Sequence, residues 1–189
     1  MALSDRGAMD SEDGTMLFGD ADALIEWRGI ESEATHSASI LAALSQSLPG
    51  VGLTVSGKAV VIWDLHGAGT VDVYSDDRHN GILMVRSWLA ESTSQNTLLD
   101  LASLPMDFSN AFAEFDVRSR FLVMFGPVES GGCIRIRSTI EYFLSEDDMM
   151  TESSGLIFTV ANGCYRCFHD TVKNEQGEAR RCYVVPNVA

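Results

Sequence analysis

Residues 51–90 constrain the fold more than any other stretch of this sequence, because they predict three consecutive strands. Residues 58–63 (KAVVIW) form a short β-branched run without helical spacing, which is typical of a strand buried on both faces. Residues 70–74 alternate apolar and polar side chains, as a half-buried strand does. Asn80 and Gly81 tolerate positive φ angles and favour a turn before the apolar run 81–85. The stretch therefore predicts a three-strand meander.

The rest of the chain predicts further strands and a few short helices. Helical spacing with capping or stop residues occurs in 20–27, in 37–48 and, interrupted by Pro105, in 91–115. Candidate strands after residue 115 are 120–125, 133–137, 155–160 and a hairpin of 163–172 with 179–185. About eight strands in two blocks, with three or four short helices that do not alternate with them, predict an α+β fold with largely antiparallel sheet.

The chain of 189 residues is long enough for one sizeable core and short for two domains. Residues 1–15 are small, polar and acidic, a composition that predicts disorder. We therefore expect a disordered segment 1–15 and a single domain over 16–189. Trp27 and Trp88 are large apolar side chains, and we expect both in the core.

The charge of the chain bears on its partners. The formal net charge is −14, and residues 1–33 hold nine acids against two bases. A second acidic region, residues 141–152, contains no base. Such a surface repels nucleic-acid phosphates and anionic lipids, and it favours association with a basic protein. Acidity also serves solubility alone, which is the plainer interpretation.

Localisation follows from the absence of targeting patterns. The first residues (MALSDRGAMDSEDG) lack the basic and apolar regions of a signal peptide, and no apolar run approaches the ~20 residues that span a bilayer. We therefore expect a cytoplasmic protein in which the four cysteines are reduced thiols.

The sharpest local motif is a cysteine cluster near the C-terminus. Cys164, Cys167 and His169 lie close in sequence, and Cys182 lies across the predicted hairpin, which is the ligand inventory of a zinc site. In a regular strand, however, Cys164 and Cys167 point to opposite faces. Buried structural thiols are therefore the favoured interpretation, and a metal-binding or enzymatic domain is the alternative.

Two further polar groups follow the central strands. His66 and Asp64 offer a histidine beside a carboxylate, but no nucleophile motif accompanies them, so we interpret His66 as a solvated loop residue. Asp76 and Asp77 sit at the predicted hairpin tip, where turn chemistry accounts for them without a ligand. The sequence predicts no catalytic residue, no cofactor and no bound metal.

Several short segments resemble the immunity proteins of bacterial polymorphic-toxin systems, and among them the family catalogued as immunity protein twenty-one. The segments span most of residues 14–186 and are GTMLF at 14–18, WRG at 27–29, LMVRSWLA at 83–90, FLVMF at 121–125 and NGCYR at 162–166. The resemblance implies a protein that binds a cognate toxin stoichiometrically and covers its active site.

Partner-binding residues are predicted from that resemblance together with the charge. Exposed acids in loops would complement a cationic groove on the toxin, and the expected residues are Asp76, Asp77, Glu146, Asp147 and Asp148. Met149 and Met150 beside these acids offer an adaptable apolar alternative within the same class. A self-associating structural subunit is the remaining alternative, since the sequence leaves the oligomeric state open.

Overall fold

The computed structural model describes residues 3–11, 14–27, 49–89, 95–126, 142–143, 155–175 and 177–187. These residues form two sheets in which every paired strand is antiparallel, so the predicted antiparallel sheet is confirmed. The first sheet contains, in spatial order, β1 (Leu3–Ser11), β5 (Gly69–Asp76), β6 (Gly81–Leu89), β12 (Gly177–Pro186), β11 (Gly163–Asn174) and β7 (Ala113–Val117). The second contains β3 (Gly50–Val55), β4 (Lys58–Asp64), β2 (Thr15–Asp20), β8 (Phe121–Phe125), β10 (Gly155–Thr159) and β9 (Tyr142–Phe143).

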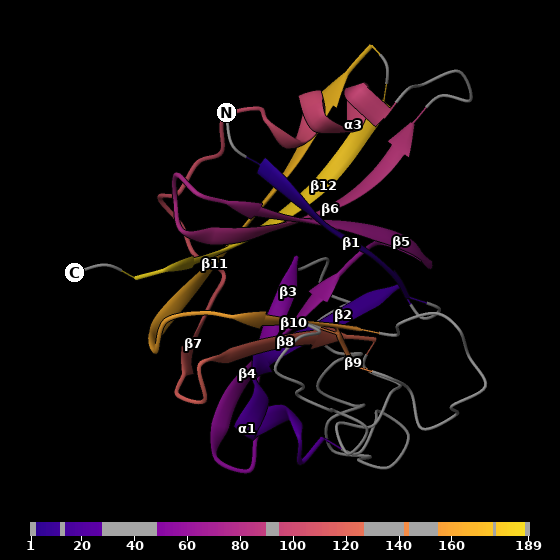
Figure 1. The fold of residues 1–189 in the computed structure, drawn as a ribbon. Helices are drawn as coiled ribbons and strands as arrows, with labels where there is room; N and C mark the ends of the chain where they lie inside the picture. Colours follow the sequence, from indigo (N-terminus) through magenta and orange to yellow (C-terminus); the bar gives the residue numbers. More distant parts are fainter. Residues whose placement is uncertain are drawn as a thin grey trace.

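The two sheets pack face to face as a β-sandwich, and the main apolar core lies between them (Figure 1). Alternate side chains of each strand point into this core, as the two-residue period of a strand requires. The first sheet contributes Met9, Val71, Val73, Met84, Cys182 and others, and the second contributes Phe18, Val61, Trp63, Met124 and Phe158. The inner face of the first sheet is thereby defined by Met84 on β6 and Cys182 on β12.

Each sheet is also covered on its outer face, so neither exposes a broad apolar surface. Helix α3 (Gln95–Ala102) and the chain that follows it pack on the first sheet through Leu98, Leu101 and Phe108. Helix α1 (Ala21–Leu24) and Trp27 cover the second sheet. Figure 1 shows the two helices on opposite outer sides of the sandwich.

The predicted meander is only partly correct. All three strands exist, and β5 and β6 form the expected hairpin with Asn80 at φ 48°. Strand β4, however, pairs with β2 and β3 in the second sheet. The chain turns from one sheet to the other at His66 and Gly67, which have φ angles of 63° and 112°. Hydrophobic periodicity identifies a strand but not the sheet that receives it.

The N-terminal segment corrects the prediction of disorder over 1–15. Residues 3–11 pair with β5 along its whole length, and Met9 reaches the core at 1% exposure. The Ser11 hydroxyl also donates to the carbonyl of Thr15, at 2.6 Å. The prediction of disorder failed because composition does not show that a distant strand, β5, supplies hydrogen-bond partners for the backbone of this segment.

The helical content is lower than that of the predicted α+β fold with three or four helices. In the described ranges there are two helices: α1, which Asp20 caps as predicted by accepting from the Asp22 N–H, and α3. Helix α3 ends before Pro105, as the predicted interruption requires, but the further helical turn expected in 109–115 is absent. The predicted helix at 37–48 and strand at 133–137 lie outside the described residues. Neither described helix is long and apolar enough to cross a membrane.

Candidate functional site

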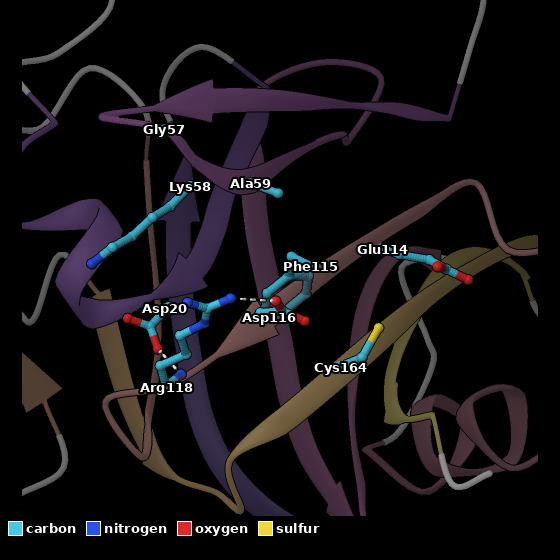
Figure 2. A pocket seen from close by; sticks show the side chains of 9 residues that line it. All are labelled: Asp20, Gly57, Lys58, Ala59, Glu114, Phe115, Asp116, Arg118 and Cys164. Atoms are coloured by element: carbon cyan, nitrogen blue, oxygen red, sulfur yellow. Dashed lines mark hydrogen bonds and ion pairs between the residues drawn. The ribbon is translucent and has the colours of Figure 1, made fainter.

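A cavity with acidic side chains at its rim lies beside β7, which forms one edge of the first sheet among the described strands (Figure 2). It has a volume of about 330 Å³ and lies between β7 and the start of β4. Phe115 and Ala59 form an apolar wall of the cavity, and Glu114 and Asp116 form its acidic rim. An edge strand presents backbone N–H and C=O groups that are not paired with another strand. The cavity therefore combines three kinds of binding group: backbone hydrogen-bonding groups of β7, carboxylates and an apolar wall.

The acidic rim is solvent-accessible and already has basic neighbours. Glu114 and Asp116 are 54% and 53% exposed. The Glu114 carboxylate lies 3.1 Å from the Arg166 Nε, and the Asp116 carboxylate lies 3.1 Å from an Arg118 nitrogen. Exposed pairs of this kind contribute little to stability, so a partner can exchange them at low cost.

Asp20 is a buried organising residue of the same cavity. Its Oδ2 accepts hydrogen bonds from the backbone N–H groups of Arg118 and Ser119, and Oδ1 caps α1. The carboxylate therefore fixes the β7–β8 turn against the start of α1. Because its lone pairs are already used, Asp20 shapes the cavity and is not its binding group.

A second cavity, of about 480 Å³, lies on the other side of the β7–β8 turn. Arg118 of that turn lines the first cavity and Arg120 lines the second. Asp77 is exposed here, as the sequence predicted, and it shares the wall with Arg6 and Asn80. The two cavities lie at one end of the sandwich, which we call the acidic end after its exposed carboxylates Glu114, Asp116 and Asp77. Exposed bases line the same cavities: Lys58 and Arg118 the first, Arg6 and Arg120 the second.

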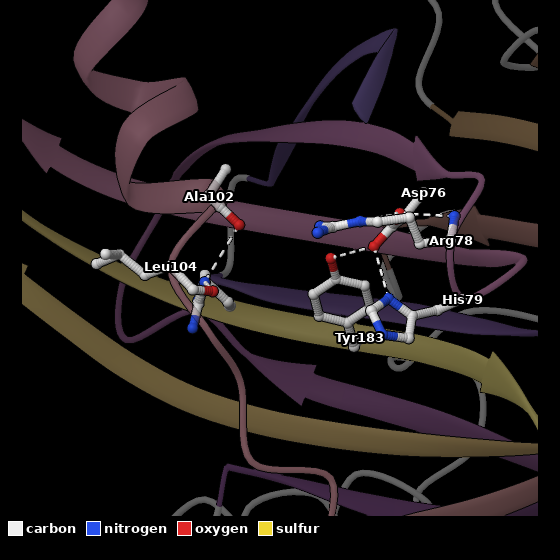
Figure 3. A network of polar contacts seen from close by, with 7 residues as sticks. Asp76, Arg78, His79, Ala102, Leu104 and Tyr183 are labelled. Carbon is white, nitrogen blue, oxygen red and sulfur yellow. Dashed lines mark hydrogen bonds and ion pairs between the residues drawn. The ribbon is translucent and has the colours of Figure 1, made fainter. Parts of the chain in front are cut away.

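Asp76 corrects the prediction of an exposed acid. Its side chain is 1% exposed and accepts hydrogen bonds from the Tyr183 hydroxyl at 2.8 Å and from the backbone N–H of Arg78 at 3.0 Å (Figure 3). The His79 ring nitrogen lies 2.8 Å away. Burial raises the pKa of Asp76, but the hydrogen bonds from His79, Tyr183 and Arg78 outweigh burial and leave that pKa below its usual value. Asp76 therefore holds the hairpin turn and does not face a partner.

A buried arginine that the sequence analysis did not single out lies beside this network. Arg181 is 0% exposed, and its Nε donates to Asp170 at 2.9 Å. Its terminal nitrogens donate to four backbone carbonyls, those of Leu101, Ala102, Leu104 and Pro105. The sequence feature that could have identified Arg181 is a charged residue within a largely apolar strand, at a position where the alternation of side chains directs it beneath α3.

The cysteine cluster does not assemble. Cys167 and Cys182 are buried in the core, whereas Cys164 lies at the acidic cavity, so the predicted opposite orientation of Cys164 and Cys167 is confirmed. Burial raises the pKa of both buried thiols well above the usual value, which keeps them protonated. Within the described ranges, no three side chains of His, Cys, Asp or Glu are placed to hold a metal ion.

His169 bridges the two sheets at the end opposite the acidic cavities. Its Nδ1 lies 3.3 Å from the Trp63 Nε1 and 3.0 Å from the Arg181 carbonyl oxygen, so one tautomer accepts from Trp63 and the other donates to the carbonyl. Burial, followed by the charge of Arg180, lowers the pKa of His169 to about 4. The ring is therefore neutral at pH 7.

Asp64 and His66 lie at the same end. The Asp64 Oδ1 accepts from the His66 backbone N–H at 2.8 Å, which closes a local turn. The His66 side chain is largely exposed, with its Nδ1 4.0 Å from the Asp64 carboxylate. The structure thus confirms a solvated loop histidine, and it brings Asp64 toward Arg180, at 3.8 Å, a proximity that sequence spacing did not predict.

Glu146, Asp147 and Asp148 lie outside the described residues, as do Met149 and Met150. Their predicted roles stay predictions. In comparisons with known proteins, the chain matched no family model, no curated protein and no solved structure.

Proposed function

We propose that this chain is an immunity protein, which binds a cationic bacterial toxin stoichiometrically and covers the toxin's active site. The observation that carries the proposal is the disposition of charge at the acidic end. An acidic rim beside an apolar wall and an open strand edge can receive a basic segment through carboxylates, packing and backbone hydrogen bonds together.

The charge balance of the whole chain supports the proposal. The formal net charge is −14, and several of the basic side chains pair with the chain's own carboxylates. Ion pairs within the described residues involve Lys58, Arg78, Arg118, Arg166, Lys173, Arg180 and Arg181. The surplus carboxylates therefore dominate the field outside the protein, which accelerates association with a basic partner.

The resemblance to polymorphic-toxin immunity proteins supports the same class. It implies inhibition by occlusion, which requires a binding surface and no catalytic group. A toxin that acts in the cytoplasm would meet its inhibitor there, so we propose a cytoplasmic complex. Metal-dependent or enzymatic use of the cysteines is not favoured, because Cys164 is separated from the buried Cys167 and Cys182.

The first experiment expresses the neighbouring open reading frame in a test bacterium with and without this chain. The proposal expects a product that is lethal alone and tolerated when co-expressed. Light scattering on the purified mixture should then show a complex of fixed stoichiometry. A neighbour that is harmless in the absence of this chain, or lethal in its presence, would contradict the proposal. A chain that forms its own oligomer and binds no toxin would instead support the structural-subunit alternative.

Charge reversal then locates the surface. Asp77→Lys and Asp116→Lys should each slow association with the toxin several-fold at low salt and weaken its salt dependence. Glu175→Lys, which makes the same change at the exposed β11–β12 turn, is the matched control and should leave the rate nearly unchanged. Asp147→Lys with Asp148→Lys tests the acids outside the described residues. If reversal at Glu175 slowed association as much as reversal at the acidic end, net charge alone would govern association and the assignment of a binding surface would be wrong.

A further inference from the structure

Arg180 on β12 is a nearly buried arginine whose charge is poorly satisfied. Its side chain is 14% exposed, and its closest carboxylate, on Asp64, lies 3.8 Å away. Its Nε is buried without a hydrogen-bond partner among the described residues. A guanidinium removed from water is costly unless its donors find acceptors. The Nε of Arg166 also lacks a well-aligned hydrogen bond, but it lies 3.1 Å from the carboxylate of Glu114.

A second arginine faces the same space. Arg86 on β6 is directly opposite Arg180 in the strand register. Arg86 lies two residues after Met84, and Arg180 lies two residues before Cys182. Because Met84 and Cys182 face the core, both arginines project from the inner face of the first sheet. Like charges directly opposite across strands repel each other. The pair therefore requires compensation from an anion.

The surroundings hold Arg86 in position and leave donors open. Its terminal nitrogens donate to the carbonyls of Ala68 at 2.8 Å and Thr70 at 3.4 Å, whereas its Nε is buried without a described partner. The guanidinium lies against Gly69, at a position where a Cβ would collide with it. It also stacks 5.0 Å from the centre of the Trp88 ring. Trp88 is 37% exposed, which corrects its predicted place in the core.

Among the described residues, the carboxylates near the two arginines are only partly available to them. Asp64 lies 3.8 Å from Arg180, and its other oxygen is engaged in the His66 turn. Burial raises the pKa of Asp72 and the charge of Arg86 lowers it, so Asp72 is a second carboxylate near the arginine pair. His169 is neutral at pH 7, since its pKa lies at about 4. Glu178, farther along the same face, pairs with Lys173 at 3.5 Å. A monoanion adds less to a net charge that is already −14 than a doubly charged anion does.

We propose that Arg86 and Arg180 bind the carboxylate group of a small organic acid at this end of the sandwich. Guanidinium groups match carboxylates geometrically, because parallel N–H donors meet two oxygens. The exposed Trp88 ring offers an apolar surface to the body of the acid. This arginine end, defined by Arg86, Arg180 and Trp88, is distinct from the acidic end, so its ligand is independent of toxin binding.

The test is a titration of the purified protein with sodium benzoate and with sodium acetate at pH 7, with sodium chloride holding the ionic strength constant. The ¹H–¹⁵N resonances of the arginine Nε–H groups report on the site directly. We expect saturable shifts of the Arg86 and Arg180 signals with both acids, and tighter binding of benzoate through Trp88. No saturable shift up to about 50 mM, far above a millimolar dissociation constant, would overturn the proposal.

Variants and anions separate the site from general ion binding. Arg180→Gln should weaken benzoate binding at least tenfold, followed through the Arg86 signal, and Arg180→Lys should also weaken it because the planar fork is lost. The control Arg118→Gln removes an exposed arginine and should bind normally. Inorganic phosphate binding more tightly than benzoate would overturn the carboxylate assignment, and equal shifts with chloride alone would overturn a specific site. The wild-type titration decides the matter even if a variant fails to fold.

Discussion

Arg180 and Arg181 are neighbours in sequence on β12, yet they lie in opposite environments. Arg181 points to the outer face, where Asp170 and carbonyls at and just after the end of α3 accept from its guanidinium. Arg180 points to the inner face, where it meets a second arginine and one carboxylate at 3.8 Å. Strand alternation alone produces the separation, because successive side chains project to opposite faces.

The difference shows that burial of a charge does not by itself define its role. A guanidinium saturated by the protein is fixed and has no donor left for a ligand, so Arg181 serves the fold. A guanidinium that the protein leaves partly unsatisfied retains binding capacity, at some cost in stability. Four perturbations, taken in order of decreasing effect, test whether this distinction holds.

The largest effect is expected from Arg181→Met, which leaves Asp170 and four carbonyls without their donor. The free energy of unfolding should fall by about 3–5 kcal/mol, as for other broken buried pairs. Denaturant unfolding measures it. Adding Asp170→Leu should recover part of the loss, because the second change removes the unpaired carboxylate. A loss below about 1 kcal/mol in the single variant would contradict a structural role for Arg181.

Arg181 anchors the chain that follows α3, and this contact also shows why the sequence predicted the fold only in part. Strands β5, β6, β11 and β12 were found because periodicity and turn residues are local signals. The helix ends at Ala102, the further turn expected after Pro105 does not form, and carbonyls at the end of the helix and just after it bond to a side chain about 80 positions away. The transfer of β4 to the second sheet and the pairing of β1 depend on such distant partners as well.

A second test concerns Asp76, the other saturated charge on the outer face. Asp76→Asn should lower the free energy of unfolding by about 2–3 kcal/mol, since the amide cannot accept from Tyr183, His79 and Arg78 together. The lowered pKa of Asp76 means that the wild type loses stability as the pH falls below about 4, when the unfolded carboxyl takes up a proton first. Acid unfolding should be shallower in the Asn variant, and an unchanged acid limb would contradict this assignment.

Sequence predicted the candidate sites unevenly for a related reason. Asp77 was placed correctly at the surface, but its neighbour Asp76 was not, because a hairpin tip does not reveal that Tyr183 lies within reach. Residue type identified Asp64 and His169 as separate features. Their approach to Arg180 required the pairing of β11 with β12 and the packing of the two sheets, neither of which is a local property.

A third test uses His169, which borders the inner-face cluster. Its pKa of about 4 lies below the unfolded value, so the unfolded state binds the proton first as the pH falls. The wild type should therefore lose stability between about pH 6.5 and pH 4, by about 1–2 kcal/mol because the ring is partly exposed. His169→Gln should remove that loss, measured by thermal unfolding across this range. His79→Gln is the control for titration of another histidine, and equal flattening in both variants would argue against His169.

The smallest change in stability is expected from Arg180→Gln, and that small size completes the comparison with Arg181. The substitution removes a poorly paired charge and relieves its repulsion with Arg86, while it sacrifices a weak contact with Asp64. These terms oppose each other, so the free energy of unfolding should change by less than about 0.5 kcal/mol in ligand-free buffer. Added benzoate should raise the melting temperature of the wild type and not of the variant, since a ligand that binds the native state stabilises it by mass action. A large loss of stability without ligand would place Arg180 in the same structural class as Arg181.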